Sequence, residues 1–130
     1  MESKEDVEAL ERLIGQLKGL QAEISQLARK APNDAVNAFK LKLINKVINA
    51  GNGVLRENYR PFMEFEEFDT DTVPTNSDVT MILTQYMEQA ERYRSDNVYY
   101  EPNSGSWKYR IGGKASDIKT APPSRIGTKK

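Results

Sequence analysis

The first thirty residues contain the feature that most constrains the fold, a long apolar stripe at helical spacing. Ser3 and Asp6 have the spacing of a helix-capping pair, and Pro32 ends the pattern because the residue before a proline avoids the α region. The a and d positions of the heptad pattern are occupied by Val7, Leu10, Ile14, Leu17, Gln21 and Ile24. A second row of leucines widens the stripe, which favours a helical bundle over a two-stranded coiled coil.

Gln21 is the one polar residue in this stripe, and two interpretations of it remain open. A polar residue at an a position can determine register or oligomeric state. It can equally lie at the edge of the stripe, where it contacts water. We expect the stripe as a whole to mediate self-association.

Two further helices are predicted. The second covers residues 33–50 and continues to about 58, with Asn33 as its N-cap and a kink at Gly51-Asn52-Gly53. The third runs from about 77 to 95, and Thr75 and Asp78 precede it with capping-box spacing. Residues 59–76 between these helices are irregular, apart from a short helical turn expected around three phenylalanines at 62, 65 and 68.

The C-terminal part predicts a small amount of β-structure. Two β-prone runs, 98–101 and 106–111, flank a Pro-Asn-Ser-Gly tract and form a predicted β-hairpin. From residue 112 onward the composition is that of a flexible basic tail. The predicted fold is therefore mainly α: a three-helix bundle with a C-terminal hairpin in a single domain, 1–111, followed by the tail, 112–130.

Composition excludes several kinds of chemistry. The chain has no histidine and no cysteine, so the usual zinc, copper and haem sites and the Ser-His-Asp and Cys-His mechanisms are not expected. We therefore expect a protein that is not an enzyme and has no cofactor. The remaining enzymatic alternative is acid–base or metal-dependent catalysis by acidic residues of the irregular segment, namely Glu64, Glu66, Asp69 and Asp71.

The N-terminus and the hydropathy of the chain bear on its location. The first six residues are mostly charged, which is unlike a signal peptide. No apolar run approaches the roughly 18–20 residues that cross a bilayer. We expect a cytoplasmic protein that does not engage a membrane.

The charges of the chain cancel in sum but are segregated along it. Residues 61–101 carry ten acidic residues against two basic ones, a local charge of −8, whereas residues 102–130 carry seven basic residues against one acidic one, a local charge of +6. Residues 32–60 have a local charge of +3. Such segregation is typical of surfaces that meet a partner of opposite charge, which can be another part of the chain, a second copy or another molecule.

Arginines and aromatic residues are interleaved in several places. Aromatic rings stack on nucleobases and arginine donates to phosphate, so these residues are candidates for contact with a nucleotide or nucleic acid. The candidates are Arg60, Arg92, Arg94, Trp107, Tyr109 and Arg110, with Lys42, Lys46 and Arg56 next. On this hypothesis Arg92 and Arg94 can be replaced by alanine without unfolding the protein. The alternative is that the aromatic members pack in the core.

These observations lead to two functional hypotheses. The first is a non-enzymatic interaction subunit that self-associates and engages a partner protein through its acidic and basic surfaces. The second is a nucleotide- or nucleic-acid-binding accessory protein, which could sequester a small nucleotide. The sequence does not identify the partner, the ligand or the number of subunits.

Overall fold

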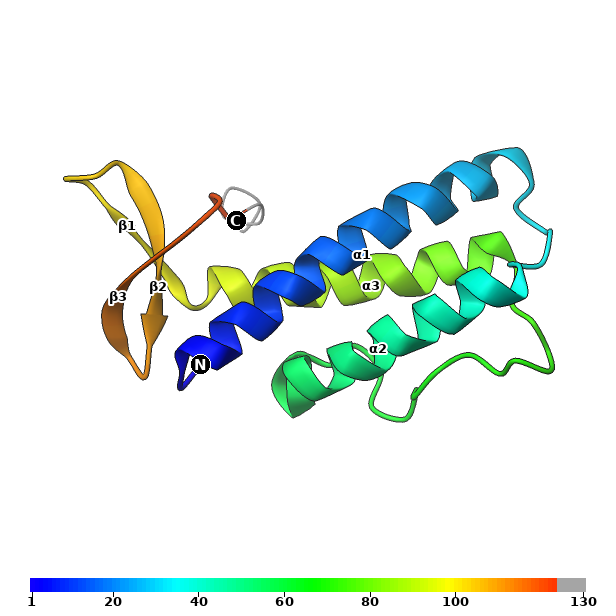
Figure 1. Cartoon of the computed structure of the whole chain (residues 1–130), viewed down its shortest axis with the longest axis horizontal. Coiled ribbons are helices and arrows are strands. Elements are labelled where there is room, and N and C mark those ends of the chain that lie inside the picture. The colour runs from blue at the N-terminus through cyan, green and yellow to red at the C-terminus, as the bar shows by residue number, and fades with distance from the viewer. Residues whose placement is uncertain (124–130) are drawn as a thin grey trace.

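The computed structural model describes residues 1–123. It contains three helices, α1 (Lys4–Lys30), α2 (Ala38–Tyr59) and α3 (Asn76–Ser95), followed by the strands β1 (Val98–Glu101), β2 (Ser106–Ile111) and β3 (Lys114–Thr120). The helices lie alongside one another, and the sheet sits at one end of them, near the N-terminus (Figure 1). The fold is thus mixed, with helix as the larger part and a small antiparallel sheet, and not the mainly α fold that we predicted.

α1 and α3 begin where their capping residues predict. The Ser3 hydroxyl accepts from the backbone N–H of Asp6 at 3.2 Å, and the Asp6 carboxylate accepts from the backbone N–H of Glu2 at 2.9 Å. Before α3, Thr75 and Asp78 form a reciprocal capping box. Both starts are therefore determined by residues that lie within one turn of each other.

α2 departs from the prediction at both positions that we singled out. Its N-cap is Asn37, whose side chain accepts from the Lys40 N–H, and Asn33 lies outside the helix. The backbone stays helical through Gly51-Asn52-Gly53, and the non-helical residue is Arg56, with φ 56° and ψ −161°. Residues 62–68 also form no helix, although we expected a short helical turn there. The chain instead makes one hydrogen-bonded turn, in which the Phe65 N–H donates to the Phe62 carbonyl.

One hydrophobic core joins all three helices and the sheet. The apolar residues at the a and d positions of the N-terminal stripe are buried in it, and none of them is more than 6% exposed, whereas Leu20 and Leu27 of the second row are half-buried. Tyr86 of α3 and Tyr109 of β2 are both fully buried, so core packing is the correct interpretation for Tyr109, which was a candidate for ligand contact. The Gln21 side chain is half-buried and donates to the Thr84 hydroxyl at 2.8 Å, which ties the edge of the stripe to α3 of the same chain.

The sheet has three strands and not two. β1 pairs with β2 and β2 pairs with β3, both antiparallel, in the order β1-β2-β3. Gly112 and Gly113 make the second turn, with φ of 58° and 78°. A two-residue turn with positive φ at both positions matches the twist of a hairpin. Residues 114–120 of the expected tail are therefore a strand, and residues 124–130 lie outside the described residues.

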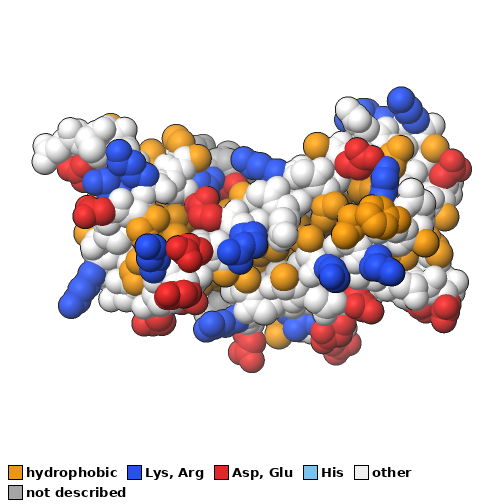
Figure 2. Space-filling view, in the orientation of Figure 1, with side chains coloured by type: hydrophobic (Ala, Val, Ile, Leu, Met, Phe, Trp, Pro, Cys, Tyr) orange, Lys and Arg blue, Asp and Glu red, His pale blue; other side chains and the backbone are white. Residues whose placement is uncertain are grey.

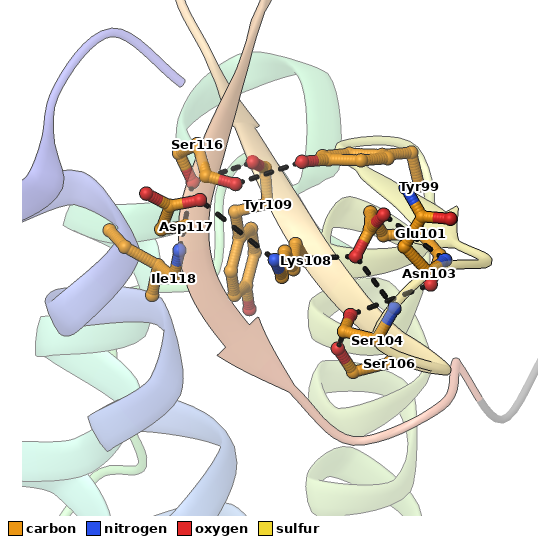
Figure 3. A network of polar contacts seen from close by, with 10 residues as sticks. All are labelled: Tyr99, Glu101, Asn103, Ser104, Ser106, Lys108, Tyr109, Ser116, Asp117 and Ile118. Carbon is orange, nitrogen blue, oxygen red and sulfur yellow. Dashed lines mark hydrogen bonds and ion pairs between the residues drawn. The ribbon is translucent and has the colours of Figure 1, made fainter.

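Polar side chains link the three strands of the sheet to one another (Figure 3). The Lys108 ammonium lies 3.6 Å from Glu101 and 3.8 Å from Asp117, so it joins all three strands. The Tyr99 hydroxyl donates to the Ser116 carbonyl at 2.9 Å. β3 is thus held by side chains as well as by its backbone pairing.

Candidate docking cleft

A cleft of about 560 Å³ lies between α2 and the segment that connects α2 to α3. That segment runs back along the helices from the end of α2 to the start of α3 (Figure 1). We call this hollow the docking cleft. It is lined by Ala38, Leu41, Lys42, Asn45, Lys46, Asn49, Glu67, Thr70 and Val73. Its volume is in the range that is usual for ligand-binding pockets.

Three asparagines on one face of α2 hold the second wall of the cleft in place. Asn45 makes two hydrogen bonds with the backbone of Phe68, one to its carbonyl at 3.0 Å and one from its N–H at 2.8 Å. One turn further on, the Asn49 amide donates to the Glu67 carboxylate at 2.7 Å. Asn52 donates to the Phe65 carbonyl at 3.1 Å. An extended segment has few backbone hydrogen bonds of its own, so the amides of Asn45 and Asn52 supply partners that its backbone lacks.

Sequence reasoning missed this role of the asparagines. The three residues are spaced at i, i+4 and i+7, which places them on one face of a helix. Their spacing was the available signal. The partners of Asn45 and Asn52 are backbone groups, which carry no side-chain pattern, and the partner of Asn49 is one of several carboxylates in the connecting segment. The same hydrogen bonds hold the segment that contributes Glu67, Thr70 and Val73 to the cleft, and none of these three was predicted as a site residue.

Lys42 and Lys46 are the basic residues of the cleft. Both side chains are exposed, and neither makes an ion pair with the acidic residues in the described part of the chain. Large apolar side chains lie on the same helix: Phe39 is 70% exposed and Leu43 is 40% exposed. The view in Figure 2 shows hydrophobic side chains gathered over the first half of α2, beside basic ones. Apolar surface next to unpaired positive charge suits an acidic, amphipathic ligand.

The other predicted ligand residues do not gather in one place. Arg94 is buried, forms an ion pair with Glu91 at 2.6 Å and donates to the carbonyl of Ala121 at 2.8 Å. Its guanidinium therefore joins the end of β3 to α3. Tyr109 is buried as well, and its hydroxyl donates to the Glu11 carboxylate at 2.5 Å. Burial and the neighbouring carboxylate raise the pKa of Tyr109 well above its ordinary value.

Arg60 and Arg92 also make contacts within the chain. Arg60 donates to the Phe62 and Phe65 carbonyls at 3.2 and 2.8 Å, so it stabilises the turn after α2. The Arg92 guanidinium lies 5.6 Å from the centre of the Tyr59 ring, and Tyr93 stacks on that ring at 4.5 Å. Burial, together with the hydrogen bond to Asp96, raises the pKa of Tyr59 to about 12.

The last three candidates lie away from the docking cleft. Trp107 is half-buried and contacts the Tyr100 ring edge-on at 5.5 Å. Arg110 lies 5.1 Å above the Tyr99 ring and donates to the Val98 carbonyl. Arg56 is exposed at the non-helical position of α2. Only Lys42 and Lys46 of the predicted residues share a hollow of the surface.

A second, smaller hollow of about 450 Å³ lies on the α3 side of the same connecting segment. It is lined by Phe62, Glu64, Phe65, Met81 and Ile82. Several apolar side chains are exposed in this region, with exposed fractions of 54% for Met63 and 58% for Met81. The two hollows share no lining residue, because the connecting segment separates them.

The acidic residues of the connecting segment are spread along it and partly engaged in contacts within the chain. Within residues 1–123 there is no group of three or more acidic side chains placed to hold a metal ion. Glu66 pairs with Arg60 at 3.3 Å, and the Asp69 carboxylate accepts from the backbone N–H of Asp71 at 2.8 Å.

No helix within residues 1–123 is long and apolar enough to cross a membrane.

Comparison of the chain with family models, curated proteins and solved structures found no match.

Proposed function

We propose that the protein is a non-enzymatic interaction subunit that binds an acidic, amphipathic segment of a protein in the docking cleft. The observation that carries this proposal is the combination, in one hollow, of an apolar floor with two lysines that have no acidic partner among the described residues. A bound carboxylate would pair with these lysines, while apolar side chains of the ligand replace water on Ala38 and Val73, which are the exposed apolar residues of the lining.

The structure changes which surface can serve this function. The stripe of α1 was our first candidate for contact with another molecule, but its apolar residues are covered by the core of the same chain. A second molecule could reach them only by separating the helices. The exposed apolar side chains of α2 remain available, and Phe39 is the most exposed of the large hydrophobic residues in the described part of the chain.

The second candidate function, binding of a nucleotide or nucleic acid, keeps one supporting observation, which is that Lys42 and Lys46 lie together in the cleft. Most of the arginines and aromatic rings that suggested it are engaged in contacts within the chain. The cleft also has no aromatic ring in its lining on which a base could stack. We therefore place a protein ligand first.

Selection from a random-peptide display library on the purified protein tests this function. We expect enriched peptides to combine acidic residues with large apolar ones. We expect enrichment to disappear for the variant Lys42→Glu/Lys46→Glu, called the cleft variant below, because like charges repel. A control variant, Lys18→Glu/Lys114→Glu, changes the net charge equally at exposed lysines outside the cleft and should keep the same peptides. Identical peptides on the cleft variant, or no enrichment on the wild type, would contradict the proposal.

A further inference from the structure

The surface around the smaller hollow has the chemistry that the docking cleft would accept. We call it the acidic patch and define it as Phe62, Met63, Glu64 and Met81. All four side chains are exposed, with exposed fractions between 39% and 58% for the three apolar residues. Glu64 makes no hydrogen bond or ion pair with another described residue, so its charge is available.

We infer, on the basis of the proposed function, that the occupant of the docking cleft is the acidic patch of a second copy of this chain. The two surfaces are complementary in charge. The patch carries the carboxylate of Glu64, and the cleft carries the ammonium groups of Lys42 and Lys46, while the single carboxylate in its lining, Glu67, accepts a hydrogen bond from Asn49. Each surface also exposes large apolar side chains next to its charges. Apolar contact supplies affinity and opposite charge sets the orientation of the two chains.

The positions of the two surfaces determine the type of assembly. The cleft and the hollow of the patch have no lining residue in common. One copy can therefore offer its patch to a second copy and receive the patch of a third at the same time. A contact between two different surfaces is heterologous, and it continues as a chain of subunits unless the rotation between them closes a ring.

The methionines of the patch support an adaptable contact. Met63 and Met81 are among the most exposed apolar residues described, and methionine is flexible and polarisable, which is typical of surfaces that fit more than one shape. The charged rims remain accessible to solvent, so salt weakens their attraction over a screening length of about 8 Å at physiological ionic strength. We expect an association that depends on protein concentration and weakens in high salt.

Size exclusion with light scattering on the purified full chain tests this inference. At low salt we expect a mass above that of the monomer, which rises with protein concentration and falls in high salt. The cleft variant should weaken the association by more than about tenfold, since two lysines that attract the Glu64 carboxylate are replaced by glutamates that repel it. The patch variant Met63→Lys/Glu64→Lys should do the same. The control variant Lys18→Glu/Lys114→Glu should associate like the wild type.

Mixing the two variants provides the decisive measurement. The cleft variant carries acidic residues on both surfaces, and the patch variant carries basic residues on both, so neither variant should associate with itself. In an equimolar mixture each contact joins an acidic surface to a basic one, so we expect association to return. Failure of the mixture to associate, or a wild type that is monomeric at all salt concentrations, would overturn the inference. So would association carried by bound nucleotide, which excess absorbance at 260 nm would reveal. If the protein is monomeric and the cleft still selects acidic peptides, the proposed function stands and only the second copy is excluded.

Discussion

Arg94 occupies a position where a charged side chain must be paired to be tolerated. Its side chain is 5% exposed and that of its partner Glu91 is 7% exposed. The buried guanidinium also leaves its Nε atom without a hydrogen-bond partner among the described residues. An arginine with these surroundings is a structural residue, and the sequence could not show this because its contacts with residues 120–122 join segments that are far apart in the chain.

The first prediction concerns this ion pair. Replacing Arg94 with alanine should lower the free energy of unfolding by about 3–5 kcal/mol, because Glu91 would remain as a buried, unpaired charge. The exposed neighbour Arg92 is the matched control, and its replacement by alanine should cost at most about 1 kcal/mol, mainly through the loss of its contact with the Tyr59 ring. Urea unfolding of both variants measures the difference. Equal losses in the free energy of unfolding for the two variants would contradict the structural role of the buried ion pair between Arg94 and Glu91. The expectation that both arginines can be replaced by alanine without unfolding the protein did not take into account that Arg94 is buried and paired with Glu91.

The second prediction concerns the ionisation of Tyr59. Folding raises its pKa from 10.0 to about 12, chiefly because the ring is partly buried and then because its hydroxyl donates to Asp96. The neutral phenol therefore stabilises the fold below pH 10, and this contribution is lost as the pH rises from 10 to 12. Tyrosinate absorbance at 295 nm follows the titration.

Tyr59→Phe should remove a step near pH 12 from that titration and reduce the loss of stability between pH 10 and 12. Tyr100→Phe is the control, because the Tyr100 ring is 50% exposed and lies on the sheet. A step near pH 10 that disappears in Tyr59→Phe would contradict the burial of this hydroxyl.

At the scale of the element, the helix starts show where local chemistry is sufficient. α1 and α3 begin at capping residues whose partners lie within four positions, so the sequence alone predicts them. The start of α2 could not be predicted in this way. Residues 34–36 are extended because they pair with residues 74–76: the Val36 N–H donates to the Pro74 carbonyl at 3.0 Å, and the Asn76 N–H donates to the Asp34 carbonyl at 2.9 Å. This pairing delays the helix by one turn.

The third prediction compares the two asparagines that compete for the role of N-cap. Asn37→Ala should destabilise the protein by about 1 kcal/mol, because the Lys40 N–H loses its acceptor at 2.8 Å. Asn33→Ala should stay within about 0.5 kcal/mol of the wild type, since Asn33 is exposed and lies before the helix. Thermal unfolding monitored by circular dichroism distinguishes them. A larger loss of stability for Asn33→Ala than for Asn37→Ala would contradict Asn37 as the N-cap and support the helix start at Asn33 that the sequence predicted.

At the scale of the whole molecule, β3 is the main feature that the sequence did not reveal. Lys114–Thr120 contains a single large apolar residue, Ile118, and several charges, so its composition is that of a tail. Its pairing with β2 and its contact with α1 supply what its own sequence lacks. Thr120 donates to the Glu11 carboxylate at 2.7 Å, across 109 residues. The same carboxylate accepts from Tyr109, so one acidic residue of α1 holds two strands.

The fourth prediction tests this connection. Glu11→Ala should speed amide hydrogen exchange in β3 and leave the interior of α1 and α3 nearly unchanged, because it removes two of the contacts that hold the sheet on the helices and leaves the core intact. Glu8→Ala is a suitable control, since Glu8 is exposed on the same helix one turn earlier. Uniform exchange changes across the whole chain would show that the sheet and the helices open together, which would contradict a local role for Glu11.

The sequence by itself determined the existence of three helices, the starts of α1 and α3, and the first hairpin turn, because each depends on residues that are neighbours along the chain or on one helical face. Only the tertiary structure decided that the stripe of α1 is covered by its own chain, that β3 is a strand, and that three asparagines of α2 shape the docking cleft. These features depend on contacts between distant segments. Burial and hydrogen bonding at such distances are set by how the elements meet, and no local pattern of residues records that.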